Sequence, residues 1–239
     1  MKPFPDSGAP VRAVTFDVGG TLIEPWPSVG QLYADAAARH GCGSIPAGLL
    51  QSRFRDAWRT RPRFDHARAG WAALVDEVFR GLTDAPPSAT FFPELYGRFA
   101  QADSWRVFGD VAPTLDALAA AGVRLGIISN WDERLRPLLR SLDLERRFES
   151  IVISCEAGAV KPDGAIFDLA AAAFGLPPAS ILHVGDSLDH DVRGARAAGF
   201  RAVQVRRNPG ATAPGDAIRD LSELLTGIVP TKAKTDKSG

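Results

Sequence analysis

Six polar side chains in this sequence could together carry out chemistry on a phosphoryl group. They lie at the ends of short apolar runs or in the segments that follow them, and they are Asp17, Ser129, Asn130, Lys161, Asp186 and Asp191. Breaking a bond to phosphorus requires a nucleophile, positive charge beside the phosphoryl oxygens and, commonly, a metal ion. Carboxylates supply the nucleophile and the metal ligands, whereas hydroxyl, amide and ammonium groups donate hydrogen bonds to oxygen. All of these groups are present, although they come from distant parts of the chain.

The three aspartates have distinct expected roles. Asp17 follows the run Val-Thr-Phe and can attack phosphorus to give an aspartyl phosphate. Asp186, and Asp191 from the turn that follows it, can join Asp17 as ligands of Mg²⁺, which favours a few carboxylates together with waters and phosphate oxygens. A turn residue is the alternative for Asp17, and the N-cap of a helix is a second possible role for Asp191. We favour the nucleophile and metal roles.

Lys161, Ser129 and Asn130 are the expected phosphate-binding residues. The Ser129 hydroxyl and the Asn130 amide can donate to phosphoryl oxygens. Lys161 can supply a fixed positive charge to the reaction and also balance the carboxylates. Apart from Lys2 and the three lysines of the C-terminal tail, it is the only lysine in the chain. A turn hydrogen bond for Ser129 and a surface position for Lys161 are the simpler alternatives.

The elements that must position these residues alternate between strand and helix. The apolar runs predict strands at 11–17, 123–129, 150–154, 180–185 and 202–205, and the intervening patterns predict helices at 114–121, 133–142, 163–174, 191–198 and 218–225. Such alternation indicates an α/β fold with a Rossmann-like parallel sheet, buried on both faces. Ligands of these sheets bind beyond the carboxyl ends of the strands, where the six polar residues fall. His183, inside a strand, is expected to pack in the core.

Residues 24–108 interrupt this pattern with helical periodicity. Trp71, Leu74, Val75 and Val78 follow the spacing of one helix face, and we find no convincing strand in the block. The chain is therefore predicted to have a core of residues 11–23 and 109–229, an all-helical insert at 24–108 and a disordered tail at 230–239. Three arginines of the insert are expected on a solvated loop face rather than at a substrate, and they are Arg59, Arg61 and Arg63.

Composition excludes several classes of protein. The chain has 239 residues, 45% of them hydrophobic, with 28 basic and 28 acidic residues, so no global field attracts nucleic acid or an anionic membrane. No apolar stretch approaches the roughly 20 residues of a membrane span. The two cysteines, Cys42 and Cys155, form no disulfide framework or metal motif, which favours a reducing, cytoplasmic setting. The oligomeric state is not indicated.

Taken together, the motifs resemble those of the haloacid dehalogenase superfamily. The similarity rests on Phe-Asp-Val-Gly-Gly-Thr-Leu at 16–22, Ile-Ser-Asn-Trp-Asp at 128–132, Lys-Pro-Asp at 161–163 and His-Val-Gly-Asp-Ser at 183–187, in that order. The resemblance is to subgroup I, which carries a helical C1 cap between the first two motifs. It implies a magnesium-dependent hydrolase of a small phosphorylated metabolite, with an aspartyl-phosphate intermediate and a cap that governs substrate choice. It also implies that the Gly19 carbonyl is a metal ligand.

Gly19 departs from the pattern of phosphatases in this family. They usually carry a second Asp at this position, two residues after the nucleophile, which protonates the leaving group and later activates water. Glycine cannot transfer a proton. Because general acid catalysis matters most for a basic leaving group, we expect aryl phosphates, acyl phosphates or anhydrides to be better substrates than sugar phosphates.

The missing Asp leaves two other functions open. A haloacid dehalogenase also uses an Asp nucleophile, but it needs no metal, and Asp186 and Asp191 would repel the carboxylate of a haloacid. A catalytically weak relative that binds a phosphorylated ligand or a partner is the second alternative, and Gly19 is its main support. A phosphonoacetaldehyde hydrolase would need a lysine in the insert for a Schiff base, and residues 24–108 contain none.

Overall fold

A six-stranded parallel sheet forms the centre of the protein. The computed structural model describes residues 10–61, 64, 66–207 and 217–228. The strand order is β5-β4-β1-β6-β7-β8, and every neighbouring pair is parallel. The strands are β1 Ala13–Phe16, β4 Arg124–Ser129, β5 Ser150–Ile153, β6 Ile181–Gly185, β7 Arg201–Val205 and β8 Ala217–Ile218.

Strand β1 lies in the middle of this sheet and is buried on both faces. Its side chains alternate: Val14 and Phe16 belong to one hydrophobic cluster, and Ala13 belongs to the cluster on the opposite face. β1 pairs with β4 on one side and with β6 on the other. Since all three strands are parallel, their carboxyl ends meet at one edge, and the residues that follow them are brought together there.

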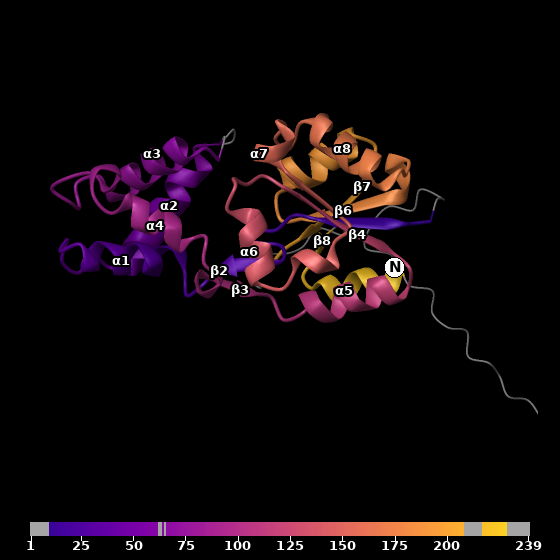
Figure 1. Ribbon diagram of the computed structural model, residues 1–239, viewed down its shortest axis with the longest axis horizontal. Coiled ribbons are helices and arrows are strands. Elements are labelled where there is room, and N and C mark those ends of the chain that lie inside the picture. The colour runs from indigo at the N-terminus through magenta and orange to yellow at the C-terminus, as the bar shows by residue number, and fades with distance from the viewer. Residues whose placement is uncertain (1–9, 62–63, 65, 208–216, 229–239) are drawn as a thin grey trace, which may run out of the picture.

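Helices cover both faces of the sheet, as Figure 1 shows with α5 on one side and α8 on the other. One face is covered by α5 Val111–Ala120, α6 Leu135–Ser141 and the C-terminal turns Leu221–Leu224 and α10 Leu225–Ile228. The other is covered by α8 Gly164–Phe174, α9 Gly194–Ala197 and the π-helical turn Leu188–Arg193. α7 Ser154–Ala157 and the 3₁₀ turns Glu145–Arg147 and Pro178–Ser180 complete this part. The predicted α/β class with a Rossmann-like parallel sheet is confirmed.

Four helices within residues 29–98 form a separate group beside the sheet (Figure 1). They are α1 Val29–Arg39, α2 Ala47–Arg59, α3 Arg68–Phe79 and α4 Phe92–Arg98, with 3₁₀ turns at Pro87–Ala89 and Ala102–Ser104. Their apolar faces pack on one another in a cluster of their own, which includes Tyr33, Leu50, Leu74 and Phe91. Among the described residues, none of the helices has the length and apolar character needed to cross a membrane.

Two short strands lie where the chain enters and leaves these helices. β2 Ile23–Pro25 and β3 Trp105–Val107 pair antiparallel, with Ile23 opposite Val107. The expectation of no strand in 24–108 is therefore wrong at both ends of the block. Three residues are too few to show a periodicity, and the pairing joins segments far apart in sequence, so nothing local signals it. The division into a core and an insert at 24–108 stays a prediction.

The C-terminal part of the core differs in detail from the expectation. Ile218 lies in β8, and the helical turns begin only at Leu221, where Asp220 and Glu223 form a capping box. The segment expected as one helix at 191–198 is a π-helical turn followed by the short α9. The predicted disordered tail at 230–239 lies outside the described residues.

Gly30 gives a direct test of the packing between α1 and α2. A Cβ at this position would collide with the carbonyl oxygen of Ala47 and lie 2.7 Å from the backbone nitrogen of Gln51. We expect Gly30→Ala to lower the free energy of unfolding by about 1–3 kcal/mol, because the two helices must separate to admit the methyl group. Urea denaturation followed by circular dichroism measures this change.

Gly48 provides the matched control, since a Cβ there would meet nothing within 4 Å. It lies in the first turn of α2, so Gly48→Ala should leave stability unchanged or raise it by up to about 1 kcal/mol. Equal stability of the two variants would show that α1 and α2 do not pack as described.

Candidate active site

Asp17 follows β1 at the centre of the carboxyl edge of the sheet. Its backbone N–H donates to the carbonyl of Val184 on β6 (2.9 Å), which fixes the residue between the two strands. The residue is 8% exposed, and its Oδ1 accepts hydrogen bonds from Ser129 Oγ (3.0 Å) and Lys161 Nζ (2.8 Å). Both bonds go to one oxygen, so Oδ2 is the atom left for attack or for metal ligation.

Lys161 is buried, and all three of its N–H groups are used. The ammonium donates to Asp17 Oδ1, to the carbonyl of Ile128 (2.8 Å) and to Asp191 Oδ1 (2.6 Å), and the residue is only 3% exposed. Burial alone would lower the pKa of Lys161, but the charges of Asp17 and Asp191 outweigh it and raise the pKa above its usual value. Lys161 is therefore a permanent cation that joins two carboxylates.

Asn130 holds the backbone of this lysine. Its side-chain oxygen accepts from the Lys161 N–H (2.8 Å), and its Nδ2 donates to the Lys161 carbonyl (3.0 Å). This pair of bonds aligns the loop that carries Lys161 with the end of β4. The predicted contact of the Asn130 amide with a phosphoryl oxygen stays a prediction. The structure adds a positioning role that the sequence analysis did not include.

Asp17, Asp186 and Asp191 meet at this edge of the sheet, and each offers an oxygen within 4.8 Å of the others. Burial raises the pKa of Asp17. The positive charge of Lys161 opposes this shift, and the negative charge of Asp191 adds to it. The Asp186 side chain is open to the cavity above it, yet desolvation at the cavity floor and the charges of Asp17 and Asp191 raise its pKa as well. Three carboxylates thus face one ammonium, an arrangement that a hard divalent cation with oxygen ligands fits.

Asp191 is the most fully bonded of the three. Its Oδ1 accepts from Lys161 and lies 3.2 Å from His183 Nε2, and its Oδ2 accepts from the backbone N–H of Ser187 (2.9 Å). Burial would raise its pKa, but Lys161 and then His183 lower it well below the usual range. Asp191 therefore positions Lys161 and the loop after β6. Its role as a direct metal ligand stays a prediction.

His183 has a function in this network beyond the expected core packing. It is fully buried against Phe167, and its Nδ1 lies 2.9 Å from the hydroxyl of Thr15, its register partner on β1. Burial lowers the pKa of His183. A histidine paired across the strands with a threonine is a signal of a buried polar contact, but the register that reveals it is visible only in the folded sheet.

Trp131 fills the space beside Gly19. A Cβ on Gly19 would lie 3.2 Å from Cζ3 of the Trp131 indole, so an Asp at this position would require the ring to shift. The position of the Trp131 ring therefore fits a glycine at position 19 better than the aspartate that is usual there. Trp131 is not among the expected site residues, although it directly follows Ser129 and Asn130 in the motif at 128–132. The predicted ligand role of the Gly19 carbonyl stays a prediction.

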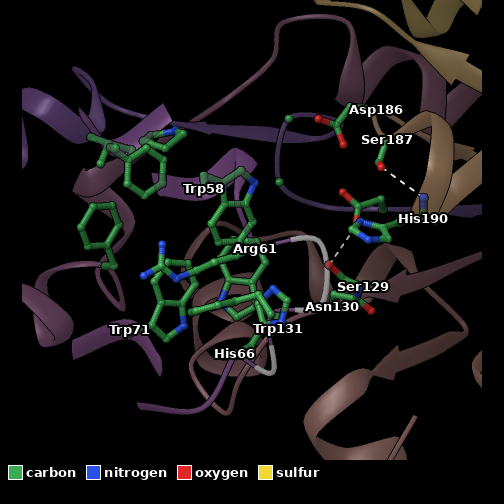
Figure 2. Close-up of a pocket in the computed structure, with 18 of the residues that line it drawn as sticks. Trp58, Arg61, His66, Trp71, Ser129, Asn130, Trp131, Asp186, Ser187 and His190 are labelled. Atoms are coloured by element: carbon green, nitrogen blue, oxygen red, sulfur yellow. Dashed lines mark hydrogen bonds between the residues drawn. The ribbon is translucent and has the colours of Figure 1, made fainter. Parts of the chain in front are cut away.

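Asp17, Lys161 and Asp186 lie, with their neighbours, at the floor of a cavity of about 730 Å³. The cavity extends to the helices of residues 29–98. Figure 2 shows Asp186, Ser187 and Ser129 on one side of it, and Trp58, Trp71 and Arg61 on the other. The volume is that of a typical small-molecule site and far exceeds that of a phosphoryl group.

Hydrogen bonds connect the inserted helices to the loop after β4. Trp71 Nε1 donates to Asp132 Oδ2 (3.0 Å), and the Arg134 guanidinium pairs with the same carboxylate. Arg134 also donates to the carbonyl of Tyr96 and lies 3.6 Å from the centre of its ring. Of the arginines expected on a solvated face, Arg59 is largely exposed as expected and pairs with Asp56, whereas Arg61 is partly buried and pairs with Glu77; both also line the cavity. Arg63 lies outside the described residues.

Replacing Lys161 by methionine should destabilise the fold strongly. The substitution leaves Asp17 and Asp191 buried without their cation, and we expect it to lower the free energy of unfolding by about 3–5 kcal/mol in EDTA. The matched control is Arg146→Met, which breaks an exposed pair with Asp143 and should cost at most about 1 kcal/mol. Chemical denaturation distinguishes the two, and a similar small loss in both variants would contradict the network described here.

Comparisons with known proteins agree with this geometry. A family model of haloacid dehalogenase-like hydrolases matches residues 11–199. The chain is 33% identical, over 90% of its length and 95% of the relative, to the haloacid dehalogenase-like hydrolase domain-containing protein 3 of Danio rerio.

Solved structures include both phosphatases and dehalogenases of this kind. A HAD phosphatase from Thermococcus onnurineus is 28% identical with a TM-score of 0.65, covering 90% of this chain and 96% of its own. A 2-haloacid dehalogenase from Pseudomonas syringae pv. Tomato is 26% identical with a TM-score of 0.61, covering 90% and 97%. The sheet order, the carboxylate cluster and these matches lead to one conclusion: the chain belongs to the haloacid dehalogenase-like hydrolases.

Proposed function

We propose that this hydrolase is a magnesium-dependent phosphatase that acts on a small phosphorylated metabolite through an aspartyl phosphate on Asp17. The observation that carries the proposal is the arrangement at Asp17, where Lys161 and Ser129 donate to one carboxylate oxygen and Asp186 lies beside it. A nucleophile, a fixed positive charge, a hydroxyl donor and an acidic metal site are thus within reach of one phosphoryl group.

In the first step, Asp17 attacks phosphorus in line and the leaving-group oxygen departs with the bonding electron pair. The positive charge of Lys161 can balance the charge that shifts onto the phosphoryl oxygens, and Lys161 and Ser129 can exchange the hydrogen bonds that they donate to Asp17 for bonds to those oxygens. Mg²⁺ held by Asp17 and Asp186, with Asp191 and the Gly19 carbonyl as further expected ligands, would neutralise the same oxygens. In the second step, water attacks phosphorus, inorganic phosphate leaves and the Asp17 carboxylate is restored.

The inserted helices act as a cap in this proposal. Helices of residues 24–108 supply most of the cavity wall opposite Asp17, and the bond from Trp71 to Asp132 holds them against the core. A cap that closes on the substrate excludes water from the reacting phosphoryl group and sets the size of the leaving group. The balance of basic and acidic residues favours a small-molecule substrate over nucleic acid. The two free cysteines are consistent with a cytoplasmic location.

A haloacid dehalogenase is the second candidate, because Gly19 and the likeness to a dehalogenase structure both favour it. The carboxylate cluster argues against it. A dehalogenase must hold the carboxylate of its substrate next to the nucleophile, and here Asp186 and Asp191 already surround Asp17 with only Lys161 to balance them. Chloride release from 2-chloropropionate in EDTA would favour this alternative over the phosphatase.

Asp17→Asn tests the nucleophile. The amide cannot displace the leaving group, so we expect turnover of p-nitrophenyl phosphate with Mg²⁺ to fall by about three orders of magnitude or more. In a crystal of the natural protein, beryllium fluoride should be attached to the Asp17 carboxylate. Full activity of the variant, or fluoride bound to another side chain, would show that the mechanism is wrong.

Asp186→Ala tests the metal site. Binding to the folded state alone stabilises a protein, so Mg²⁺ should raise the melting temperature of the natural chain. The variant should lose that increase, because it lacks one of the carboxylates that hold the ion. The control is Asp189→Ala, which removes a nearby exposed carboxylate paired with Arg193 and should keep the increase. An equal increase in both variants would place the metal elsewhere.

A further inference from the structure

Four aromatic side chains form one wall of the cavity, and we call them the aromatic wall: Phe54, Trp58, Phe64 and Trp71. Trp58 stacks on Trp71 with ring centres 5.5 Å apart and planes inclined by 13°, and it also stacks on Phe54. Phe64 and Trp71 pack edge to face, with their ring centres 4.7 Å apart. Figure 2 shows Trp58 and Trp71 across the cavity from Asp186 and Ser187.

The aromatic wall is left partly uncovered, unlike the core of the inserted helices. Trp58 is 38% exposed, and the other three residues are only partly buried, whereas Leu50, Leu74 and Phe79 beside them are fully buried. Aromatic rings contribute most when another apolar or aromatic surface covers them. A wall of such rings facing a cavity therefore suits a ligand with a flat apolar surface.

The cations that line the cavity already have partners. Among the described residues, each lysine and arginine of the lining is paired with a carboxylate, namely Arg59 with Asp56, Arg61 with Glu77, Arg134 with Asp132 and Lys161 with Asp17. These pairings neutralise the cations of the lining, so a second anionic group on the substrate, such as a carboxylate or another phosphate, would have to compete with one of these carboxylates. The part of the substrate beyond the phosphoryl group is thus expected to be uncharged.

Gly19 restricts the leaving group independently. No side chain is present at this position to protonate a departing oxygen, and the Trp131 indole lies only 3.2 Å from the point where a Cβ would begin a carboxylate side chain. Trp131 is itself 5.2 Å from Trp105, so this side of the cavity is aromatic too. A phenolic oxygen is weakly basic and can depart as an anion, whereas an alkoxide needs a proton.

We propose that the substrate is an aryl phosphate, a phosphate monoester whose uncharged aromatic leaving group lies against the aromatic wall. The inference rests on the proposed phosphatase function and deepens it. An oxygen of Asp17 forms a bond to phosphorus while the bond from phosphorus to the phenolic oxygen breaks, and the aryloxide keeps the electron pair. Water then hydrolyses the aspartyl phosphate, and phosphate and the phenol are the products.

The first experiment compares two substrates that both have weakly basic leaving groups. 1-Naphthyl phosphate has an aromatic leaving group, and acetyl phosphate does not. Trp58→Ala should raise KM for 1-naphthyl phosphate about tenfold and leave kcat/KM for acetyl phosphate unchanged. The matched control is Trp26→Ala, which removes an exposed tryptophan outside the cavity lining and should change neither. Trp58→Phe should restore most of the affinity, and thermal melting verifies that each variant is folded.

The second experiment is independent of turnover. Isothermal titration with 1-naphthol should show binding to the natural chain and to Trp26→Ala, and at least tenfold weaker binding to Trp58→Ala. If acetyl phosphate is hydrolysed but Trp58→Ala affects neither naphthyl phosphate nor naphthol, the aromatic inference is overturned and the phosphatase stands. If naphthol binds as expected but no phosphate ester is hydrolysed, the proposed function fails and the aromatic site is retained.

Discussion

The ammonium of Lys161 between the carboxylates of Asp17 and Asp191 is the interaction on which the rest of the site depends. A buried lysine is costly unless its charge is balanced and its protons are all bonded, and here both conditions are met. The two carboxylates come from the segment after β1 and from the turn after β6, and the lysine comes from the loop that follows β5 and α7. One charged contact therefore fixes the relative positions of three loops at the carboxyl edge of the sheet.

The neighbours of this contact can be understood as its supports. Asn130 bonds to both backbone polar groups of Lys161, and Ser187 donates to the Asp191 oxygen that Lys161 does not use. His183 connects Asp191 to Thr15 in the middle of the sheet, so the charged edge is joined to the buried core by hydrogen bonds. Such fully bonded networks are rigid, which suits residues that must hold a phosphoryl group in one geometry.

The sequence predicts the convergence of the charged residues but not the contacts that refine it. Asp17, Ser129 and Asp186 each follow an apolar strand, and in a parallel sheet such positions meet at one edge, so the pattern was sufficient. The pairing of His183 with Thr15 depends on strand register, which is a tertiary property. The antiparallel pairing of β2 with β3 also escapes notice, because each strand has only three residues and the two are far apart in sequence.

The contact between Trp131 and Gly19 could not be predicted from either residue alone. Gly19 alone indicates a missing side chain, whereas the structure shows that an indole from the loop after β4 lies against the vacant position. The two residues are more than a hundred positions apart in the chain, so the sequence around one of them gives no indication of the other. The same applies to the cavity wall, whose rings come from α2, α3 and the segment between them.

The saturation of the network also limits which group can move a proton in the reaction. Lys161 has its pKa raised and all of its protons bonded, so it is a poor acid for a leaving group. Asp191 accepts bonds on both oxygens and its pKa is lowered, so it is a poor base for water. Other titratable side chains line the cavity, among them Asp186, Asp189 and His190 after β6 and His66 in the opposite wall. A proton donor in place of residue 19 would therefore have to come from one of these side chains or from water, and a leaving group that needs no proton avoids this requirement.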